Sequence, residues 1–363
     1  MAFMRSCDIR LLATLLLATT GQAGTATCPF DSAVASFQNL LSAQQLKGGA
    51  MLLGDRQGLY LERYFGSYDA ETVVAIASAS KWLSAVRILQ LRDQGLLDLA
   101  APVSLYLPQF SGEKGTMTLR QMFSHTAGYG DDSFAAVLIN PSLSLAQAVD
   151  QIACCRPLNS GYAVGAQFSY GGVSMHIGGR VAEVAGGGDW QTQWQQQLGA
   201  PLGVTTIDWG ASAGSNYGIA GGARSNLRDY GRVLHMLVND GRGNGRQVLK
   251  PATAALLRVD QVGRLPVAYA PPNVTPPVRY GLGNWLAGSS GQISHSLGAF
   301  GYFPWIDAAQ ARFGVFMVRG GSGFNAAAVP VYFDMLTSLD ADLAQGCLHV
   351  ERFDEILLQG FED

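Results

Sequence analysis

Lysine is scarce in this chain. Lys and Arg together number 24 among 363 residues, and the lysines are only Lys47, Lys81, Lys114 and Lys250. Charged residues make up 14% of the chain, and they form neither a basic cluster nor a long run of one sign. Such a distribution argues against nucleic acid as a partner and against a solvated charged tail. With 48% hydrophobic residues, the composition predicts a folded protein with a sizeable core.

Long apolar runs are also missing beyond the first thirty residues, so no later segment predicts a stable membrane span, which needs about 20 such residues. The start of the chain has the order of an export signal: basic residues precede the short apolar stretch Leu11–Leu17, and small residues allow cleavage after Ala23 or Ala26. We therefore expect residues 1–26 to be a signal peptide and the mature protein to be periplasmic or secreted. A buried N-terminal helix is the alternative.

Cysteine is rare as well, with five in the chain. Cys7 would leave with the signal peptide, and four would remain: Cys28, Cys154, Cys155 and Cys347. Four cysteines in an oxidising compartment allow three disulfide pairings, and the sequence does not choose among them. A bond between the first and the last would tie the two ends of the domain, leaving an adjacent pair or two thiols. Their spacing is wrong for zinc, and we predict no metal site and no cofactor.

The predicted strands lie near both ends of the chain, and helices fill the middle. The expected strands are 49–53, 59–65, 299–307 and 311–319, and the expected helices outside the middle are 31–45, 81–97, 227–238 and 325–343. This order predicts an α/β (α+β) fold with an antiparallel sheet built from both chain ends, flanked by helices and carrying an inserted, mostly helical domain. The folded domain would span 27–349, with its α/β part in about 30–100 and 216–345 and its helical part in about 101–215. Residues 350–363 would be an appended tail.

One of the few lysines lies in the small, apolar stretch "IASASKWLSA", residues 76–85. Ser78 and Lys81 are three residues apart, so at the start of a helix they share one face. A serine hydroxyl becomes a good nucleophile when a base takes its proton, and a lysine desolvated among apolar residues gives up its charge more readily. The pair therefore indicates a nucleophile and its base. A helix that happens to carry a solvated lysine is the structural alternative, and the pattern alone is weak.

Several further segments, in order, resemble the serine β-lactamase-like family, which includes class C β-lactamases, DD-peptidases and family VIII esterases. They are "LRDQGLLDLAAPVSLYLPQF", "TLRQMFSHTAGYG", "VGAQFSYGGVSMHIGGRVAEVAGG", "AGGARSNLRDYGRVLHMLVNDG" and "SHSLGAFGYFPWID". Together with the Ser-x-x-Lys segment they cover most of residues 70–320. The resemblance implies the β-lactamase/transpeptidase-like fold and an enzyme that forms an acyl-enzyme.

The resemblance also implies roles for particular residues. Ser78 matches the acylated serine, Lys81 the lysine that assists it, and Tyr170 the tyrosine that moves a proton to the leaving group. The run from His295 through Ser296 to Gly298 matches the family's third motif. His295 would orient substrate or stabilise charge beside the site, and the backbone N–H of Gly298 would join that of Ser78 in an oxyanion hole.

Two other matching positions, His125 and His176, are predicted to be structural, and His125 is expected to satisfy the backbone of a turn.

Two motifs depart from the family pattern. Gly172 stands where the Tyr-x-Asn motif has asparagine, and the third motif has His295 and Leu297 where many β-lactamases have Lys and Gly. A mostly neutral histidine is a poor partner for a substrate carboxylate, so these changes favour a neutral ester or small amide. We expect a serine hydrolase of the carboxylesterase kind, with a small ester or amide as its only predicted partner and no predicted oligomeric state. The alternatives are a β-lactamase or DD-peptidase, and a non-catalytic protein that binds cell-wall or acyl ligands.

Overall fold

The computed structural model describes residues 27–352, except 131–134, 160, 162, 211–213, 273, 275, 289–290 and 322. Its centre is a six-stranded antiparallel sheet with the order β2-β1-β12-β11-β10-β9. The strands are β1 (Gly48–Gly54), β2 (Leu59–Gly66), β9 (Trp285–Ala287), β10 (Ile293–His295), β11 (Phe303–Asp307) and β12 (Arg312–Met317). β1 pairs with β12, the last strand of the chain, with Leu52 opposite Val315, and β2 pairs with β1. The predicted fold class, with a sheet built from both chain ends, is confirmed.

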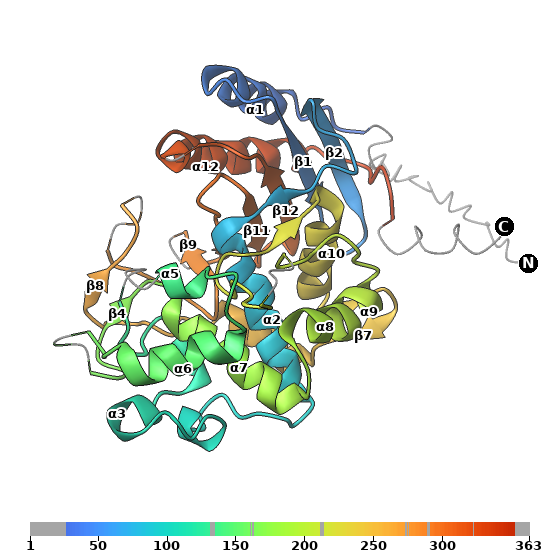
Figure 1. The fold of residues 1–363 in the computed structure, drawn as a ribbon. Helices are drawn as coiled ribbons and strands as arrows, with labels where there is room; N and C mark the ends of the chain where they lie inside the picture. The colour runs from blue at the N-terminus through green and yellow to red at the C-terminus, as the bar shows by residue number, and fades with distance from the viewer. Residues whose placement is uncertain are drawn as a thin grey trace, which may run out of the picture.

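Helices cover both faces of this sheet (Figure 1). On one face lie α1 (Asp31–Ala43) and α12 (Phe324–Leu343), whose apolar side chains share a cluster with those of β1, β11 and β12. On the other face lies α10 (Leu227–Val238), beside the long helix α2 (Ser80–Asp93). Burying apolar side chains on both faces is the main source of stability for such a layered arrangement.

The helix predicted for 81–97 begins at Ser80 and ends at Asp93. Gly95 follows with a φ of 74°, a left-handed conformation that glycine adopts without strain and that stops the helix. Nearly the whole circumference of α2 is buried, including Arg87, so it lies in the core rather than presenting one apolar stripe. Its N-terminal end is thereby fixed at the centre of the molecule (Figure 1).

The middle of the chain forms a second, largely helical layer (Figure 1). Its helices are α3 (Gly112–Gly115), α4 (Leu119–Phe123), α5 (Ala135–Leu138), α6 (Leu145–Cys155), α7 (Val173–Gly186), α8 (Trp190–Trp194) and α9 (Ala200–Leu202), and α11 (Pro251–Ala255) follows later. Capping boxes at Thr118 and Ser144 start α4 and α6. Three two-stranded ribbons complete the fold: β3 (Val74–Ala75) with β5 (Arg224–Ser225), β4 (Phe168–Ser169) with β8 (Val267–Tyr269), and β6 (Arg242–Gly243) with β7 (Arg246–Gln247).

The structure pairs Cys28 with Cys347, with their Cα atoms 5.3 Å apart, and Cys154 with Cys155. It thus adopts one of the three pairings that the sequence left open. The first bond joins the segment before α1 to the segment after α12.

The predicted tail does not begin at residue 350. The N–H of Val350 donates to the carbonyl of Leu59 at 2.7 Å, and the N–H of Leu59 donates to the carbonyl of Glu351 at 2.8 Å. Arg228 also holds the Glu351 carboxylate at 2.9 Å. These residues therefore belong to the folded domain, because they pair with the start of β2. The rest of the predicted tail, 353–363, and the predicted signal peptide lie outside the described residues.

Candidate active site

Ser78 and Lys81 meet where a short 3-10 turn, Ala77–Ala79, leads into α2. The Lys81 Nζ lies 3.0 Å from the Ser78 Oγ and donates a hydrogen bond to the Ala220 carbonyl at 2.8 Å. Lys81 is only 5% exposed, whereas Ser78 is partly exposed. The structure therefore contains a reachable hydroxyl in direct contact with a buried amine, which is the geometry needed for a nucleophile and its base.

The segment 218–225 holds this turn in place. The Ile76 N–H donates to the Ala223 carbonyl at 3.0 Å, and the Ala223 N–H donates to the Ser80 hydroxyl at 3.0 Å. Ala77, directly before the serine, has a φ of 46°, which is a strained conformation for a residue with a side chain. Such strain persists only where surrounding contacts over-determine the backbone, and here those contacts fix the position of the Ser78 hydroxyl.

Ser78 and Lys81 line a cavity of about 270 Å³, called here the small cavity. Its walls are mostly apolar or glycine, and it is completed by Leu138 and Ile139 from the end of α5 and by Gly172, His176 and the run 218–222. Gly172 thus faces the reactive serine across the cavity, where the family motif has an asparagine side chain.

Tyr170 lies beside Lys81. The Lys81 Nζ is 4.8 Å from the centre of the Tyr170 ring, and that ring stacks on Trp285 with centres 5.1 Å apart. The Tyr170 N–H donates to the Tyr269 carbonyl at 3.0 Å, next to the β4–β8 pair. Tyr170 is therefore brought to the Ser78–Lys81 pair by contacts between distant segments. Trp285, its stacking partner, carried no signal in the sequence.

His125 lies within the same aromatic cluster and is fully buried. Its Nε2 is 3.2 Å from the Tyr280 hydroxyl, and its ring centre is 4.6 Å from that of Tyr170. Burial and the charge of Lys81 hold the pKa of His125 well below its ordinary value, so the ring is neutral at pH 7. The expectation that this ring satisfies the backbone of a turn is wrong, because its partner is a phenol. Its place beside Tyr170 gives it a positioning role.

His176, in α7, is also buried, and its Nε2 lies 2.9 Å from the Asn216 Oδ1. Burial lowers the pKa of His176 to about 4. It is therefore a neutral hydrogen-bonding group in the wall of the small cavity.

The end of β10 adjoins the start of α2. The Ser296 hydroxyl donates to the Ser78 carbonyl at 2.9 Å, which joins the two elements. The Gly298 N–H, however, donates to the Tyr302 carbonyl at 2.8 Å within the turn between β10 and β11. The predicted oxyanion role of Gly298 is therefore corrected, because its donor is already paired. A Cβ on Gly298 would lie 2.2 Å from the Ile76 carbonyl oxygen, so this glycine permits the close approach of the two segments.

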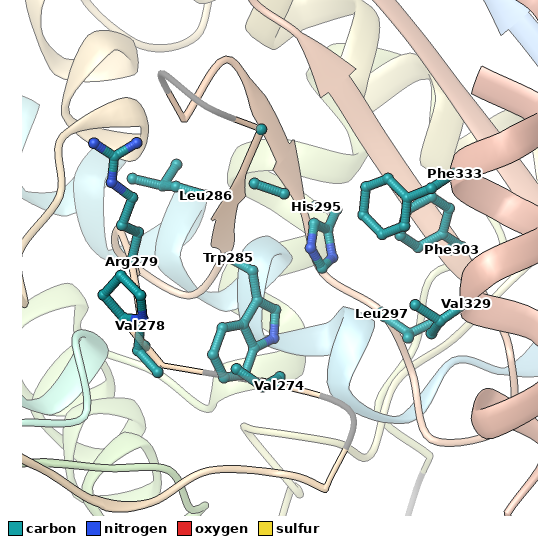
Figure 2. Close-up of a pocket in the computed structure, with 13 residues that line it drawn as sticks. Val274, Val278, Arg279, Trp285, Leu286, His295, Leu297, Phe303, Val329 and Phe333 are labelled. Atoms are coloured by element: carbon teal, nitrogen blue, oxygen red, sulfur yellow. The ribbon is translucent and has the colours of Figure 1, made fainter. Parts of the chain in front are cut away.

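His295 does not line the small cavity. Its ring packs against Phe303 at 5.2 Å and Phe333 at 5.9 Å, and faces a second cavity of about 530 Å³, called here the large cavity (Figure 2). Burial lowers the pKa of His295 to about 3. The role of His295 in orienting substrate or stabilising charge stays a prediction, and its ring faces a different cavity from the one that Ser78 lines.

No group of three or more potential metal-binding side chains occurs among the described residues. Within the same residues, no helix is both long and apolar enough to cross a membrane.

Comparisons with known proteins agree with this architecture. The family model described as Beta-lactamase matches residues 31–332. A putative β-lactamase from Bacteroides dorei superposes with a TM-score of 0.75 at 29% identity, covering 86% of this chain and 98% of that one. The chain therefore belongs to the β-lactamase family, a family of serine hydrolases.

Two further similar proteins are described as catalysing acyl transfer. EstCE1, described as a hydrolase with promiscuous acyltransferase activity, shares the fold with a TM-score of 0.68 at 17% identity, covering 85% of this chain and 99% of that one. Monacolin J acid methylbutanoyltransferase from Aspergillus terreus is 27% identical over 211 residues, or 47% of this chain. That match spans 50% of the relative's length.

Proposed function

We propose that this protein is an exported serine hydrolase that forms an acyl-enzyme at Ser78 and acts on neutral carboxylic esters or small amides. The observation that carries the proposal is the 3.0 Å contact between the Lys81 Nζ and the Ser78 Oγ at the wall of a cavity. A reactive pair in a cavity of mixed apolar and polar character is the arrangement expected of a hydrolase site.

The proposed reaction has two stages. In its neutral form, Lys81 takes the proton of Ser78 as the Ser78 Oγ bonds to the substrate carbonyl carbon. The oxyanion is stabilised by the Ser78 N–H at the start of α2, where the N–H groups of the first turn lack intrahelical acceptors and the helix field favours negative charge. The bond to the leaving group then breaks, and Tyr170 passes a proton to the departing oxygen or nitrogen. The proton held by Lys81 then passes to Tyr170, which restores both groups. In the second stage, water attacks the acyl carbon and gives a proton to the Tyr170–Lys81 pair. The bond from that carbon to the Ser78 Oγ breaks, and the pair returns the proton to the Oγ, which releases the acid and restores Ser78.

The preference for a neutral substrate rests on three positions. Gly172 supplies no amide to the small cavity, and neutral His295 offers no cation to a substrate carboxylate. Leu297 adds a buried side chain at the end of β10. The description of the methylbutanoyltransferase also supports a substrate other than a β-lactam, since that relative is named for transfer of an acyl group.

Export is part of the proposal. It is supported by the signal-like residues 1–26 and by the two cysteine pairs, which suit an oxidising compartment. N-terminal sequencing of the mature protein should begin after Ala23 or Ala26, and an intact start at Met1 in the exported fraction would contradict it.

The deciding experiment compares p-nitrophenyl butyrate with nitrocefin. The wild type should hydrolyse the ester and leave nitrocefin intact, and Ser78→Ala should lose at least about a thousandfold in kcat/KM, since the nucleophile is removed. Nitrocefin turnover that depends on Ser78 would instead favour a β-lactamase or DD-peptidase.

A fluorophosphonate probe separates an enzyme with a narrow substrate range from a binding protein. It should label the wild type and not Ser78→Ala. Ser174→Ala is the matched control, because Ser174 is also buried and its hydroxyl donates to the Met122 carbonyl. Labelling should persist in that variant. A folded wild type that neither turns over ester nor labels would favour the non-catalytic alternative.

A further inference from the structure

The large cavity has a chemistry of its own. At about 530 Å³ it falls within the range of about 300–1,000 Å³ typical of ligand sites. Its lining is mainly aromatic and aliphatic and includes Trp285, His295, Leu297, Phe303, Val329 and Phe333 (Figure 2). These side chains come from β9, β10, β11 and α12. They meet because of the order of the strands in the sheet, in which Trp285 of β9 and His295 of β10 are direct cross-strand partners.

Two contacts place the large cavity beside the reactive serine. Leu297 follows Ser296, whose hydroxyl bonds to the Ser78 carbonyl at 2.9 Å. Trp285 stacks on Tyr170, whose ring lies 4.8 Å from the Lys81 Nζ. The large cavity therefore adjoins the site on the side of Tyr170. The small cavity is lined by Ser78 and Lys81 themselves.

The polar groups of the large cavity suit an uncharged guest. The His295 Nδ1 is buried and has no hydrogen-bond partner among the described residues. Burial keeps that ring neutral at pH 7, because it lowers its pKa to about 3. The guanidinium of Arg279 points away from Trp285 and His295 (Figure 2). The inner part of the cavity thus offers apolar surface together with uncharged polar atoms, the His295 Nδ1 and the indole nitrogen of Trp285 (Figure 2).

We propose that the large cavity binds the alcohol part of the ester substrate, a bulky, uncharged, ring-bearing group, while the small cavity binds a short acyl group. This inference rests on the proposed function, in which Tyr170 protonates the leaving oxygen. That oxygen must then lie on the Tyr170 side of Ser78, which is the side of the large cavity. When the bond between the carbonyl carbon and the alcohol oxygen breaks, the alcohol takes its proton from Tyr170 and leaves through the large cavity.

The test uses two ester series followed by pH-stat titration. In one series the acyl group is butyryl and the alcohol is ethyl, benzyl or 2-naphthylmethyl. In the other the alcohol is ethyl and the acyl chain grows from acetyl to octanoyl. We expect kcat/KM to rise by about tenfold or more from the ethyl to the 2-naphthylmethyl ester, as each added apolar group is buried. In the acyl series we expect it to fall beyond short chains.

Val329→Phe fills the large cavity from α12. It should lower kcat/KM for the 2-naphthylmethyl ester about tenfold more than it lowers kcat/KM for the ethyl ester. Ala327→Phe is the matched control, because Ala327 is exposed on the same helix. That variant should leave both esters within about twofold of the wild type.

His295→Phe tests the role of the His295 Nδ1. The wild type should prefer a 3-hydroxybenzyl ester to a benzyl ester, since the hydroxyl can pair with the Nδ1, and the variant should lose that preference. Equal discrimination in both proteins would overturn the role of the Nδ1.

The outcomes separate this inference from the proposed function. Ester turnover that ignores alcohol size, or a Val329→Phe loss confined to long acyl chains, overturns the inference alone. Calorimetry on Ser78→Ala tests binding without turnover: 2-naphthylmethyl butyrate should bind, and adding Val329→Phe should weaken binding about tenfold. Unchanged binding in the double variant overturns the inference. Absence of ester turnover and of fluorophosphonate labelling in the wild type counts against the proposed function itself.

Discussion

The start of α2 and the end of β10 touch through the Ser296–Ser78 hydrogen bond, yet they differ in chemistry. The start of α2 carries Ser78 and Lys81, a polar reactive pair that keeps the family pattern. The end of β10 carries His295 and Leu297, which depart from it and face an aromatic cavity. Under the proposed function, the reaction and the choice of substrate are carried by separate elements, so each can be changed with limited effect on the other.

The first prediction concerns the reactive element and has the largest effect. Lys81→Ala should lower the acylation rate by about a thousandfold, because the base that activates Ser78 is removed. Single-turnover kinetics with p-nitrophenyl butyrate measure this rate.

Lys114→Ala is the matched control for Lys81→Ala. Lys114 is also partly buried, but it donates to the carbonyls of Ile152 and Ala153 at the end of α6, away from Ser78. This variant should lose stability and keep its acylation rate. A mild effect of Lys81→Ala, similar to that of Lys114→Ala, would show that Lys81 is not the base.

The second prediction separates catalysis from packing in the aromatic cluster. Tyr170→Phe should lower kcat by about a hundredfold, since the proton donor to the leaving group is lost while the stacking on Trp285 remains. Tyr280→Phe, which removes the partner of the His125 ring, should mainly cost stability. Urea unfolding beside steady-state kinetics distinguishes the two. Equal losses of stability and activity in both variants would assign Tyr170 to packing.

The third prediction alters the binding element. The double variant His295→Lys, Leu297→Gly should lower kcat/KM for neutral esters by about tenfold and bring measurable turnover of nitrocefin, because a cation would then face the substrate carboxylate. Circular dichroism confirms that the variant is folded. Unchanged selectivity in a folded variant would show that β10 does not select the substrate.

The fourth prediction uses the two histidines buried on the helical side of the site. Burial lowers the pKa of His125 and of His176, the latter to about 4. The unfolded chain therefore binds more protons than the folded one below the ordinary histidine pKa of about 6.5. The free energy of unfolding should fall as pH falls from about 6.5 toward 5, by up to about 1 kcal/mol per pH unit for each histidine.

Urea midpoints at pH 7.5 and pH 5 measure this dependence. His176→Gln should reduce the slope, since it removes one of the buried histidines whose pKa is lowered, a set that also includes His125 and His295, while keeping a side-chain amide near Asn216. A slope that is the same in His176→Gln and the wild type would contradict the assignment to His176.

Much of the reactive element could be predicted from the sequence, because it is local. Ser78 and Lys81 are three residues apart, and helical geometry alone places such residues on one face. Tyr170 was reached only through the ordered motifs of a family, since its approach to Lys81 depends on the distant β4–β8 pair. The surroundings of Gly298 and His295 could not be predicted from the motif, for one reason. The direction of a backbone N–H or of a ring depends on the strand partner and on the turn, and the residue types of the motif specify neither.

The sequence by itself therefore determined three things. The ordered motifs indicated the family, and the strand patterns near both chain ends predicted the antiparallel sheet. The i, i+3 spacing predicted the Ser78–Lys81 contact, because helical geometry acts over short distances. Only the tertiary structure decided which cavity each side chain enters. The stacking of Trp285 on Tyr170 and the bond from the Ser296 hydroxyl to the Ser78 carbonyl arise where segments far apart in the chain are packed together. Side chains at such contacts take the positions that fill the space and satisfy buried polar groups, and that outcome depends on all neighbours at once.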